Sequence, residues 1–163
     1  MKEEKQRLEY TIGRFDGYFD SVNNKSAAYI AINTFITGGA ITLLTQFEGV
    51  ASTHPWYQPI MGAILSLGVI SLVLLAWASI PYFTNKSDSL YYFGAIGDKS
   101  LSEFSELSKD QKQKKNLLDL REQAYVLSKG LTQKFTKLKW AGRLLLLQFI
   151  LLLPIIYLLI FKN

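Results

Sequence analysis

Residues 144–161 read LLLLQFILLLPIIYLLIF, eighteen uncharged residues between Arg143 and Lys162. A bilayer core is about 30 Å thick, and a helix that rises about 1.5 Å per residue needs about 20 apolar residues to cross it. Buried core helices seldom run this far without a charged residue. The stretch therefore predicts a membrane-spanning helix rather than the core helix of a soluble protein.

Two further stretches have the same character. Charged residues are absent from 26–47 and from 55–85, which predicts spans at Ala27–Phe47 and at roughly Pro59–Phe83. The chain has 163 residues, and its 18 Lys+Arg and 13 Asp+Glu are crowded into the remainder. The mean hydropathy of +0.14 is therefore an average over two unlike parts. The predicted fold class is an all-α membrane protein with three transmembrane helices.

The composition excludes several kinds of chemistry. There is no cysteine, which rules out disulfides, zinc-thiolate sites and thiol nucleophiles, and His54 is the only histidine. No phosphate-cradling glycine loop, paired-carboxylate arrangement or metal-ligand spacing is present. We therefore expect no enzyme, no catalytic residue, no metal and no cofactor.

The basic residues predict the orientation of the spans. Five Lys and Arg precede the first span, the linker Glu48–Gln58 has none, and residues 84–143 have twelve. Cytoplasmic flanks carry the excess of Lys and Arg. We therefore expect the two termini on opposite sides of the membrane, the N-terminus in the cytoplasm and the C-terminus outside. The 25 mixed-charge residues before the first span do not resemble a cleaved signal peptide. The expected location is the bacterial inner membrane.

Both cytoplasmic segments carry an apolar stripe at helical spacing. The first stripe comprises Leu8, Ile12, Phe15, Phe19 and Val22. The second comprises Leu117, Leu120, Ala124, Leu127, Leu131, Phe135 and Leu138. These patterns predict helical extensions of the spans that pair in a bundle or with a neighbouring subunit. The alternative is that they lie flat on anionic lipid.

The predicted organisation has four parts. Residues 1–26 form a cytoplasmic amphipathic helix, 27–83 two spans with a short external loop, 84–143 a cytoplasmic helical sensor region, and 144–163 the third span with an external C-terminus. Within the sensor region, Ser100 and Glu103 have the spacing of a capping box, which predicts a helix start there.

The first span has an unusual face of small and polar residues. Its members are Asn33, Thr34, Thr37, Gly38, Thr42 and Thr45. Such a face is costly in lipid unless it meets protein or water. Three helices alone enclose no water-filled path, so a pore lined by this face requires a homo-oligomer, and we favour a tetramer. Glu48 would then form an acidic ring at the outer mouth. The alternative is that the small residues only permit close helix packing.

A ligand is indicated by basic residues interleaved with aromatic ones. Residues 84–143 contain twelve basic and seven acidic residues, and aromatic rings beside cations suit a nucleotide or a single-stranded nucleic acid. The ligand-binding candidates are Arg14, Lys25, Lys86, Tyr91, Tyr92, Arg121, Tyr125, Lys129 and Lys134. Positive-inside topology alone accounts for part of this charge.

Several short motifs together resemble the Pycsar transmembrane effector family. They are Asn23-Asn24-Lys25-Ser26-Ala27, Tyr91-Tyr92-Phe93-Gly94, Ser100-Leu101-Ser102-Glu103-Phe104, and the helix from Arg121-Glu122-Gln123 to Lys134-Phe135. The order and spacing match over nearly the whole chain. One departure is Asn24, where the family tends to have an acidic residue ahead of the lysine, so a role for that acidic group is not carried over.

The resemblance implies a small membrane protein of bacterial anti-phage defence. Family members respond to a nucleotide made by a partner cyclase or nucleotidyltransferase and impair the inner membrane. The chain is also similar to effectors of Hailong-type systems, in which the partner enzyme makes short DNA oligomers. A cyclic mononucleotide and a single-stranded DNA oligomer are both compatible with the cytoplasmic region, and its positive charge favours a polyanion slightly.

Three functions remain open at this point. The leading one is a nucleotide-gated oligomeric channel. The second is a non-conducting membrane anchor or scaffold that recruits a cytoplasmic partner, and the third is a protein that disrupts lipid without a defined pore.

Overall fold

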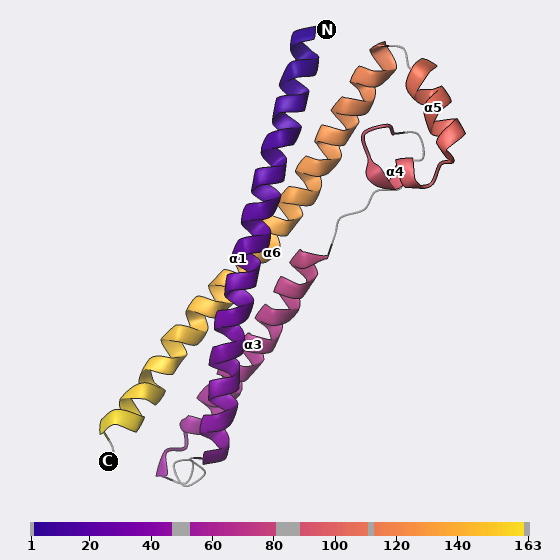
Figure 1. Cartoon of the computed structure of the whole chain (residues 1–163). Helices are drawn as coiled ribbons and strands as arrows, with labels where there is room; N and C mark the ends of the chain where they lie inside the picture. The colour runs from indigo at the N-terminus through magenta and orange to yellow at the C-terminus, as the bar shows by residue number, and fades with distance from the viewer. Residues whose placement is uncertain (1, 47–52, 81–88, 111–112, 162–163) are drawn as a thin grey trace. The chain divides into compact units, whose positions relative to one another are not determined.

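The computed structural model describes residues 2–46, 53–80, 89–110 and 113–161, and these are helical apart from short turns. In chain order the helices are α1 (Lys2–Gln46), α3 (Tyr57–Ser79), α4 (Phe93–Gly97), α5 (Leu101–Asp110) and α6 (Gln113–Phe161), as Figure 1 shows. This confirms the predicted all-α fold class.

Three of these helices, α1, α3 and α6, are long and apolar enough to cross a membrane. The chain is thus a multi-pass membrane protein with three candidate spans. The helices α1 and α6 each join an amphipathic part to an apolar part without a break, as the stripes in the sequence predicted. No proline interrupts α6 before Pro154, which lies inside its apolar part.

The second span ends earlier than the sequence suggested. We expected it to reach Phe83, but α3 ends at Ser79, and Ile80 has an extended backbone with φ −62° and ψ 130°. Pro81 follows in the sequence, and the residue before a proline is disfavoured in the helical region because of the clash with the proline ring.

The chain divides into two compact units. Unit 1 comprises Met1–Ser21 and Pro81–Gln133, and unit 2 comprises Val22–Ile80 and Lys134–Asn163. Because the boundary runs through α1 and α6, each of these helices contributes one part to each unit.

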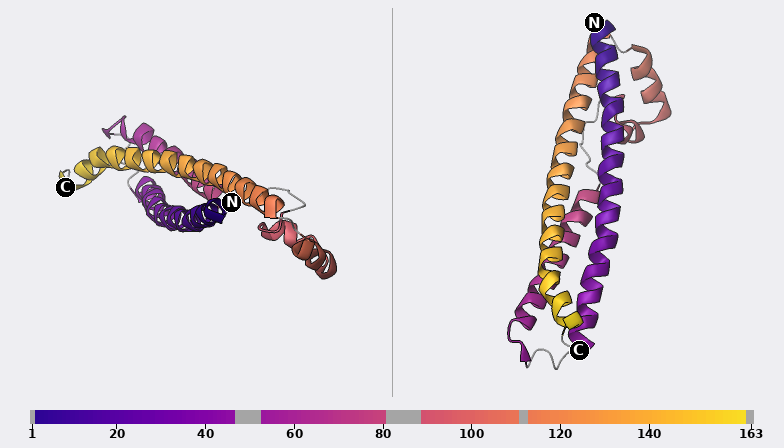
Figure 2. Two further views of the ribbon diagram at one scale, coloured as in Figure 1. Left: turned by 90° about the horizontal axis from the view of Figure 1, so that it is seen from above. Right: turned by 90° about the vertical axis from the view of Figure 1, so that its left-hand side faces the viewer.

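Unit 2 is a bundle of three helices. Within it, α3 and the unit 2 parts of α1 and α6 lie side by side in the views of Figures 1 and 2. Its core is apolar and comprises Ile36, Ala40, Tyr57, Met61, Ile64, Leu145, Ile155 and Leu158. Tyr57 is buried, and its hydroxyl donates to the carbonyl of Leu43 at 3.1 Å, which ties the start of α3 to α1.

Aromatic side chains mark the ends of the apolar part of unit 2. Trp56 precedes α3 and Trp77 lies in its last turn, and both side chains are exposed. They are 21 positions apart in the sequence, which is about 30 Å along a helix. This matches the hydrocarbon thickness of a bilayer, and tryptophan prefers the two membrane–water interfaces.

Unit 1 contains α4, α5 and the charged parts of α1 and α6. Leu120, Ala124 and Leu131 of the second predicted stripe are buried. Its last two members, Phe135 and Leu138, belong to unit 2, where Phe135 is 36% exposed and Leu138 is buried. The first stripe is half-buried from Leu8 to Phe19. An ion pair of 2.6 Å between Arg121 Nη2 and Glu4 Oε1 joins the two helices within this unit.

The predicted capping box begins α5. The Ser100 N–H donates to Glu103 Oε2 at 2.8 Å, and the Glu103 N–H donates to Ser100 Oγ at 3.3 Å. These hydrogen bonds lower the pKa of Glu103 below its ordinary value, the largest cause being the one from the backbone of Ser100. The reciprocal pair satisfies donors that a helix start otherwise leaves open, which explains why α5 begins at Leu101.

Candidate functional site

Polar side chains from the three helices of unit 2 meet in its interior. Asn33 of α1 is fully buried, and its Nδ2 donates to the carbonyl of Gly68 in α3 at 3.2 Å. Thr37, one turn later, donates from Oγ1 to Asn33 Oδ1 at 2.9 Å. Gln148 of α6 is also fully buried, and its Nε2 donates to the carbonyl of Ile64 in α3 at 3.0 Å. Asn33 and Thr37 are therefore occupied within a single chain.

The other small and polar residues of this span lie on the exposed face of α1. They are Thr34, Gly38, Thr42 and Thr45. A Cβ added at Gly38 would meet nothing within 4 Å, so the face is open at this position. Thr42 Oγ1 donates to the Gly38 carbonyl at 3.1 Å, and Thr45 Oγ1 donates to the Thr42 carbonyl at 2.9 Å. The predicted stripe is thus divided between an inner and an outer face. We define these four residues as the outer α1 face.

Two candidates cannot be located. Glu48, the expected acidic ring, and Lys86, a ligand candidate, lie outside the residues that the structure describes. Their roles remain predictions from the sequence.

The segment before α4 is held on α6 by side-chain hydrogen bonds. Ser89 is 5% exposed, and its Oγ accepts the backbone N–H groups of Tyr91 at 3.2 Å and Tyr92 at 3.1 Å. The N–H of Leu90 donates to Asp119 Oδ2 at 2.8 Å. A buried serine and a half-buried carboxylate of α6, Asp119, therefore set the position of both predicted tyrosines.

These tyrosines differ in how available their rings are. The Tyr91 ring is exposed, and its hydroxyl donates to Asn116 Oδ1 in α6. The Tyr92 ring lies beside that of Phe93, with centroids 5.1 Å apart, and also lies against Gly94, where a Cβ would come within 2.7 Å of it. Tyr91 is thus the better placed of the two to stack on a base.

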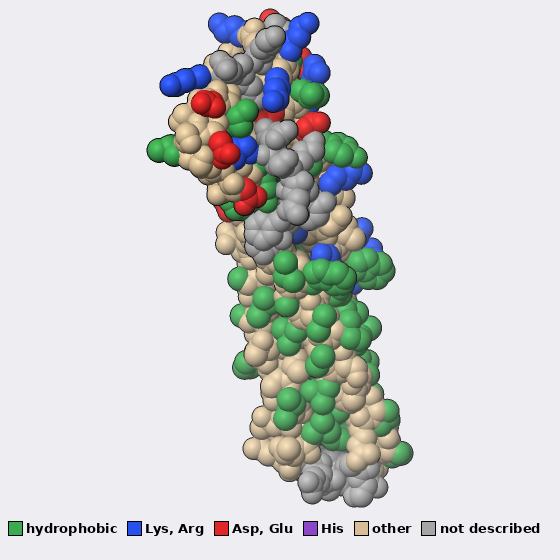
Figure 3. All heavy atoms as spheres, turned by 90° about the vertical axis from the view of Figure 1, so that its right-hand side faces the viewer, with side chains coloured by type: hydrophobic (Ala, Val, Ile, Leu, Met, Phe, Trp, Pro, Cys, Tyr) green, Lys and Arg blue, Asp and Glu red, His purple; other side chains and the backbone are tan. Residues whose placement is uncertain are grey.

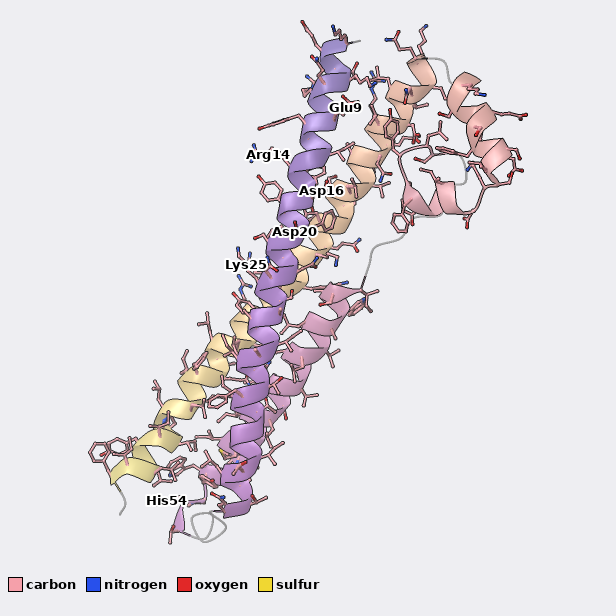
Figure 4. The ribbon with its side chains drawn as sticks, in the orientation of Figure 1. Glu9, Arg14, Asp16, Asp20, Lys25 and His54 are labelled. Atoms are coloured by element: carbon pink, nitrogen blue, oxygen red, sulfur yellow. The ribbon has the colours of Figure 1, made fainter. Side chains whose placement is uncertain are left out.

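Two predicted arginines of unit 1 have partners of their own. Arg121 pairs with Glu4, as described above. Arg14 donates from Nη2 to the Tyr18 hydroxyl at 2.7 Å, and this hydrogen bond is the largest cause of its raised pKa. In Figure 4 Arg14 points to the side of α1 that faces away from the unit 1 part of α6. Arg14 is fully exposed, so a ligand reaches it without displacing other elements.

A cation and an aromatic ring share the exposed face of α6 in unit 1. Lys129 Nζ lies 5.4 Å from the centroid of the Tyr125 ring, and the Tyr125 side chain is 62% exposed. A nucleotide has a phosphate that a cation can neutralise and a base that can stack on an aromatic ring. Lys129 and Tyr125 place a cation and a ring side by side, which suits such a ligand.

Two further ligand candidates, Lys25 and Lys134, belong to unit 2. Lys25 is exposed on α1 (Figure 4). Lys134 is 8% exposed, and its Nζ donates to the carbonyl of Ala78 at the end of α3 at 2.7 Å. Burial, and secondly the charge of Lys137, lower the pKa of Lys134. A cation at this place stabilises the free carbonyls and the negative end of the α3 dipole.

The structure therefore distributes the predicted ligand residues over both units. Unit 1 contains Arg14, Tyr91, Tyr92, Arg121, Tyr125 and Lys129. Arg121 is exposed but is paired with Glu4. The other exposed members are Arg14, Tyr91, Tyr125 and Lys129. We define these four residues as the unit 1 candidate site.

Gln148 is a buried polar residue of this interior that the sequence analysis did not single out. It is a lone amide in an apolar run, and a buried amide in a membrane requires an interhelical partner. That signal would have predicted its hydrogen bond to α3. Its Oε1 is buried without a hydrogen-bond partner among the described residues.

Comparison with protein families matches residues 7–161 to the Pycsar effector protein domain (PycTM). Neither the curated proteins nor the solved structures contain a match to the chain. The family match includes both units and all three candidate spans. The chain therefore belongs to the Pycsar transmembrane effectors, which are non-enzymatic membrane proteins of anti-phage defence, and this membership implies a cyclic-nucleotide signal made by a partner cyclase.

Proposed function

We propose that the protein is a homo-oligomeric channel of the inner membrane, opened or closed by a cyclic nucleotide that binds unit 1. Its N-terminus is cytoplasmic and its C-terminus external, and conduction depolarises the infected cell. The observation that carries the proposal is the outer α1 face, which presents small and hydroxyl side chains from a helix long enough to cross the membrane.

The argument for an oligomer begins with the inner face of α1. The side chains of Asn33 and Thr37 make hydrogen bonds inside unit 2. These two residues are therefore not available to line a water-filled path between the helices of a single chain. The outer α1 face is then a polar surface available to a second copy. Small residues allow close helix approach, and a ring of α1 helices places the hydroxyls of Thr34, Thr42 and Thr45 around a shared axis. We favour a tetramer, with Glu48 at the outer mouth.

The charge of unit 1 supports a mononucleotide over a polyanion. By sequence, unit 1 has twelve Lys and Arg and twelve Asp and Glu, so it is formally neutral. Binding a single-stranded DNA oligomer relies on excess cations that release counterions, and a neutral unit supplies few. The Tyr125–Lys129 pair offers one cation beside one ring, which suits the single phosphate and base of the cyclic nucleotide that the family implies.

A binding experiment tests the ligand. Equilibrium dialysis of the full-length protein in detergent against cyclic purine and pyrimidine mononucleotides should detect one that binds. Lys129→Gln should weaken binding by about tenfold or more, because a hydrogen bond to a charged group contributes about 1.5–3 kcal/mol and each 1.4 kcal/mol is a factor of about ten. Lys114→Gln, an exposed lysine at the start of α6, is the matched control and should bind as wild type. Binding of a single-stranded DNA oligomer and of no mononucleotide would contradict the proposal.

The second candidate function is a non-conducting membrane anchor. It is favoured by the hydroxyls of Thr42 and Thr45, whose hydrogen bonds to backbone carbonyls of their own helix also allow them to face lipid. An anchor predicts full cellular protection by a Thr42→Leu variant. A channel predicts that this variant loses protection.

A further inference from the structure

The net charge of the protein is concentrated in one unit. Unit 1 is formally neutral, so the whole excess of +5 belongs to unit 2, which has six Lys and Arg and one acidic residue, Glu48. On the face shown in Figure 3, basic and acidic side chains are intermixed over unit 1, and hydrophobic side chains are prominent over unit 2. The charge that the sequence attributed to the cytoplasmic region therefore lies largely in Lys134–Arg143, directly before the third span.

Five of the six cations of unit 2 gather at one end of its three helices. They are Lys25, Lys134, Lys137, Lys139 and Arg143, and we define them as the cationic belt. The hydrogen bond from Lys134 to Ala78 joins this part of α6 to the end of α3.

The helix α1 reaches the same level of unit 2. A Cβ at Gly142 of α6 would lie 3.0 Å from the Tyr29 ring of α1, one turn after Lys25. Glu48, the one carboxylate of unit 2, lies outside the described residues. From Lys25, α1 continues for 21 positions to its end at Gln46, which is about 32 Å along a helix. Among the described residues, no carboxylate pairs with any cation of the belt.

Two of these cations lie on tryptophan rings. Lys137 Nζ of α6 is 4.4 Å from the centroid of Trp77 in α3, and the Arg143 guanidinium carbon is 4.8 Å from the centroid of Trp140. The rings are 57% and 53% exposed. Tryptophan prefers the headgroup region of a bilayer, so these contacts hold an ammonium and a guanidinium at the depth of lipid phosphates.

We propose that the cationic belt binds the headgroups of anionic phospholipids, with Lys137 and Arg143 as the phosphate ligands. Arg143 offers a planar fork for two phosphate oxygens, and Lys137 adds a point charge at the seam between α3 and α6. The Lys134 ammonium donates to the Ala78 carbonyl, so it adds positive electrostatic potential to the belt rather than a direct contact with the phosphate. The belt directly precedes an apolar span, which makes a lipid the occupant rather than a soluble anion. The site lies in unit 2 and does not depend on the nucleotide proposal.

Tryptophan quenching by brominated lipid tests the proposal. A full-length Trp56→Phe variant retains Trp77 and Trp140, the two tryptophans that contact cations of the belt. It is reconstituted in phosphatidylcholine vesicles that contain either brominated phosphatidylglycerol or brominated phosphatidylcholine. We expect stronger quenching by the anionic lipid at equal mole fraction. Lys137→Gln with Arg143→Gln should reduce this preference by about fivefold per charge removed.

Matched variants separate a site from general charge attraction. Lys114→Gln with Lys115→Gln removes the same charge from exposed positions of unit 1 and should keep the preference. Lys137→Arg with Arg143→Lys should also keep it, and this variant decides the question if the neutral one does not fold. Equal quenching by both lipids in wild type, or an equal loss in the unit 1 control, would overturn the proposal. Stronger competition by inorganic phosphate than by sodium chloride of equal ionic strength would do the same, because it indicates a soluble-anion site.

Discussion

Gly68 of α3 lies against polar side chains from both α1 and α6. Its carbonyl accepts the Asn33 amide, and a Cβ at this position would clash with Thr37 Oγ1 and lie 2.7 Å from Gln148 Nε2. Glycine is required here because polar side chains from α1 and α6 occupy the space that a side chain would need.

Replacement of Gly68 should therefore destabilise the protein. We expect Gly68→Ala to cost about 1–3 kcal/mol, since it overpacks a tight site and disturbs buried hydrogen bonds. The thermal unfolding midpoint of the protein in detergent measures this. Gly62→Ala in the same helix is the control, because a Cβ there meets nothing within 4 Å, and its midpoint should stay at or slightly above that of wild type. Equal midpoints for both variants would show that the polar cluster does not hold the helices together.

The sequence predicted which residues of the first span are unusual but not how they divide. Asn33 and Thr34 are neighbours, yet Asn33 is buried and Thr34 exposed, because adjacent residues on a helix point about 100° apart. Which face turns inward depends on Gly68 and on the partners in α3 and α6, which lie 35 residues or more away in the chain. Local pattern contains no information about such partners, so this part of the candidate site required the structure.

At the scale of the elements, the helix start of α5 is a pH-dependent feature. The Glu103 carboxylate accepts hydrogen bonds from the Ser100 N–H and Oγ–H, each at 2.8 Å, and its pKa is lowered in the folded state. A lowered folded pKa means that this contribution is fully present above the unfolded pKa. It is lost as the pH falls through the folded pKa, so acid should fray the first turn of α5.

Nuclear magnetic resonance can follow that fraying. The Cα chemical shifts of Ser102 to Phe104 should remain helical at neutral pH and move toward coil values below about pH 4, where a free glutamate protonates. Glu103→Gln is the control, and its first turn should show no such titration. Helical shifts that persist unchanged in wild type to lower pH would show that the capping box does not hold this turn.

The elements themselves were largely predictable. Long uncharged runs gave the three spans, and uninterrupted apolar stripes gave the continuity of α1 and α6. The end of α3 was placed too late, because hydropathy continues through Phe83 while Pro81 disfavours helix at Ile80. The position of Tyr91 was not predictable, since it depends on Asn116 and Asp119 of α6, which lie 25 or more residues later in the chain.

At the scale of the whole molecule, the distribution of charge supports the nucleotide proposal for unit 1 and the lipid proposal for unit 2 separately. A formally neutral unit 1 suits a small ligand, and a unit 2 with all of the net +5 suits an anionic membrane surface. The total charge and its orientation signal follow from composition and spacing alone. The assignment of Lys134–Arg143 to unit 2 required the packing of Lys134 and Lys137 on α3.

Single-channel recording is the most direct test of a nucleotide-gated channel lined by α1. The full-length protein in a planar bilayer should show unitary conductance steps whose open probability changes when the cyclic nucleotide identified by dialysis is added. Thr42→Leu should abolish or strongly reduce the conductance. Ser66→Leu is the matched control, because Ser66 is also exposed and also donates to the carbonyl four residues earlier, but in α3. The contrary result is a wild-type protein that never conducts with or without nucleotide, or a Thr42→Leu variant that conducts as wild type does.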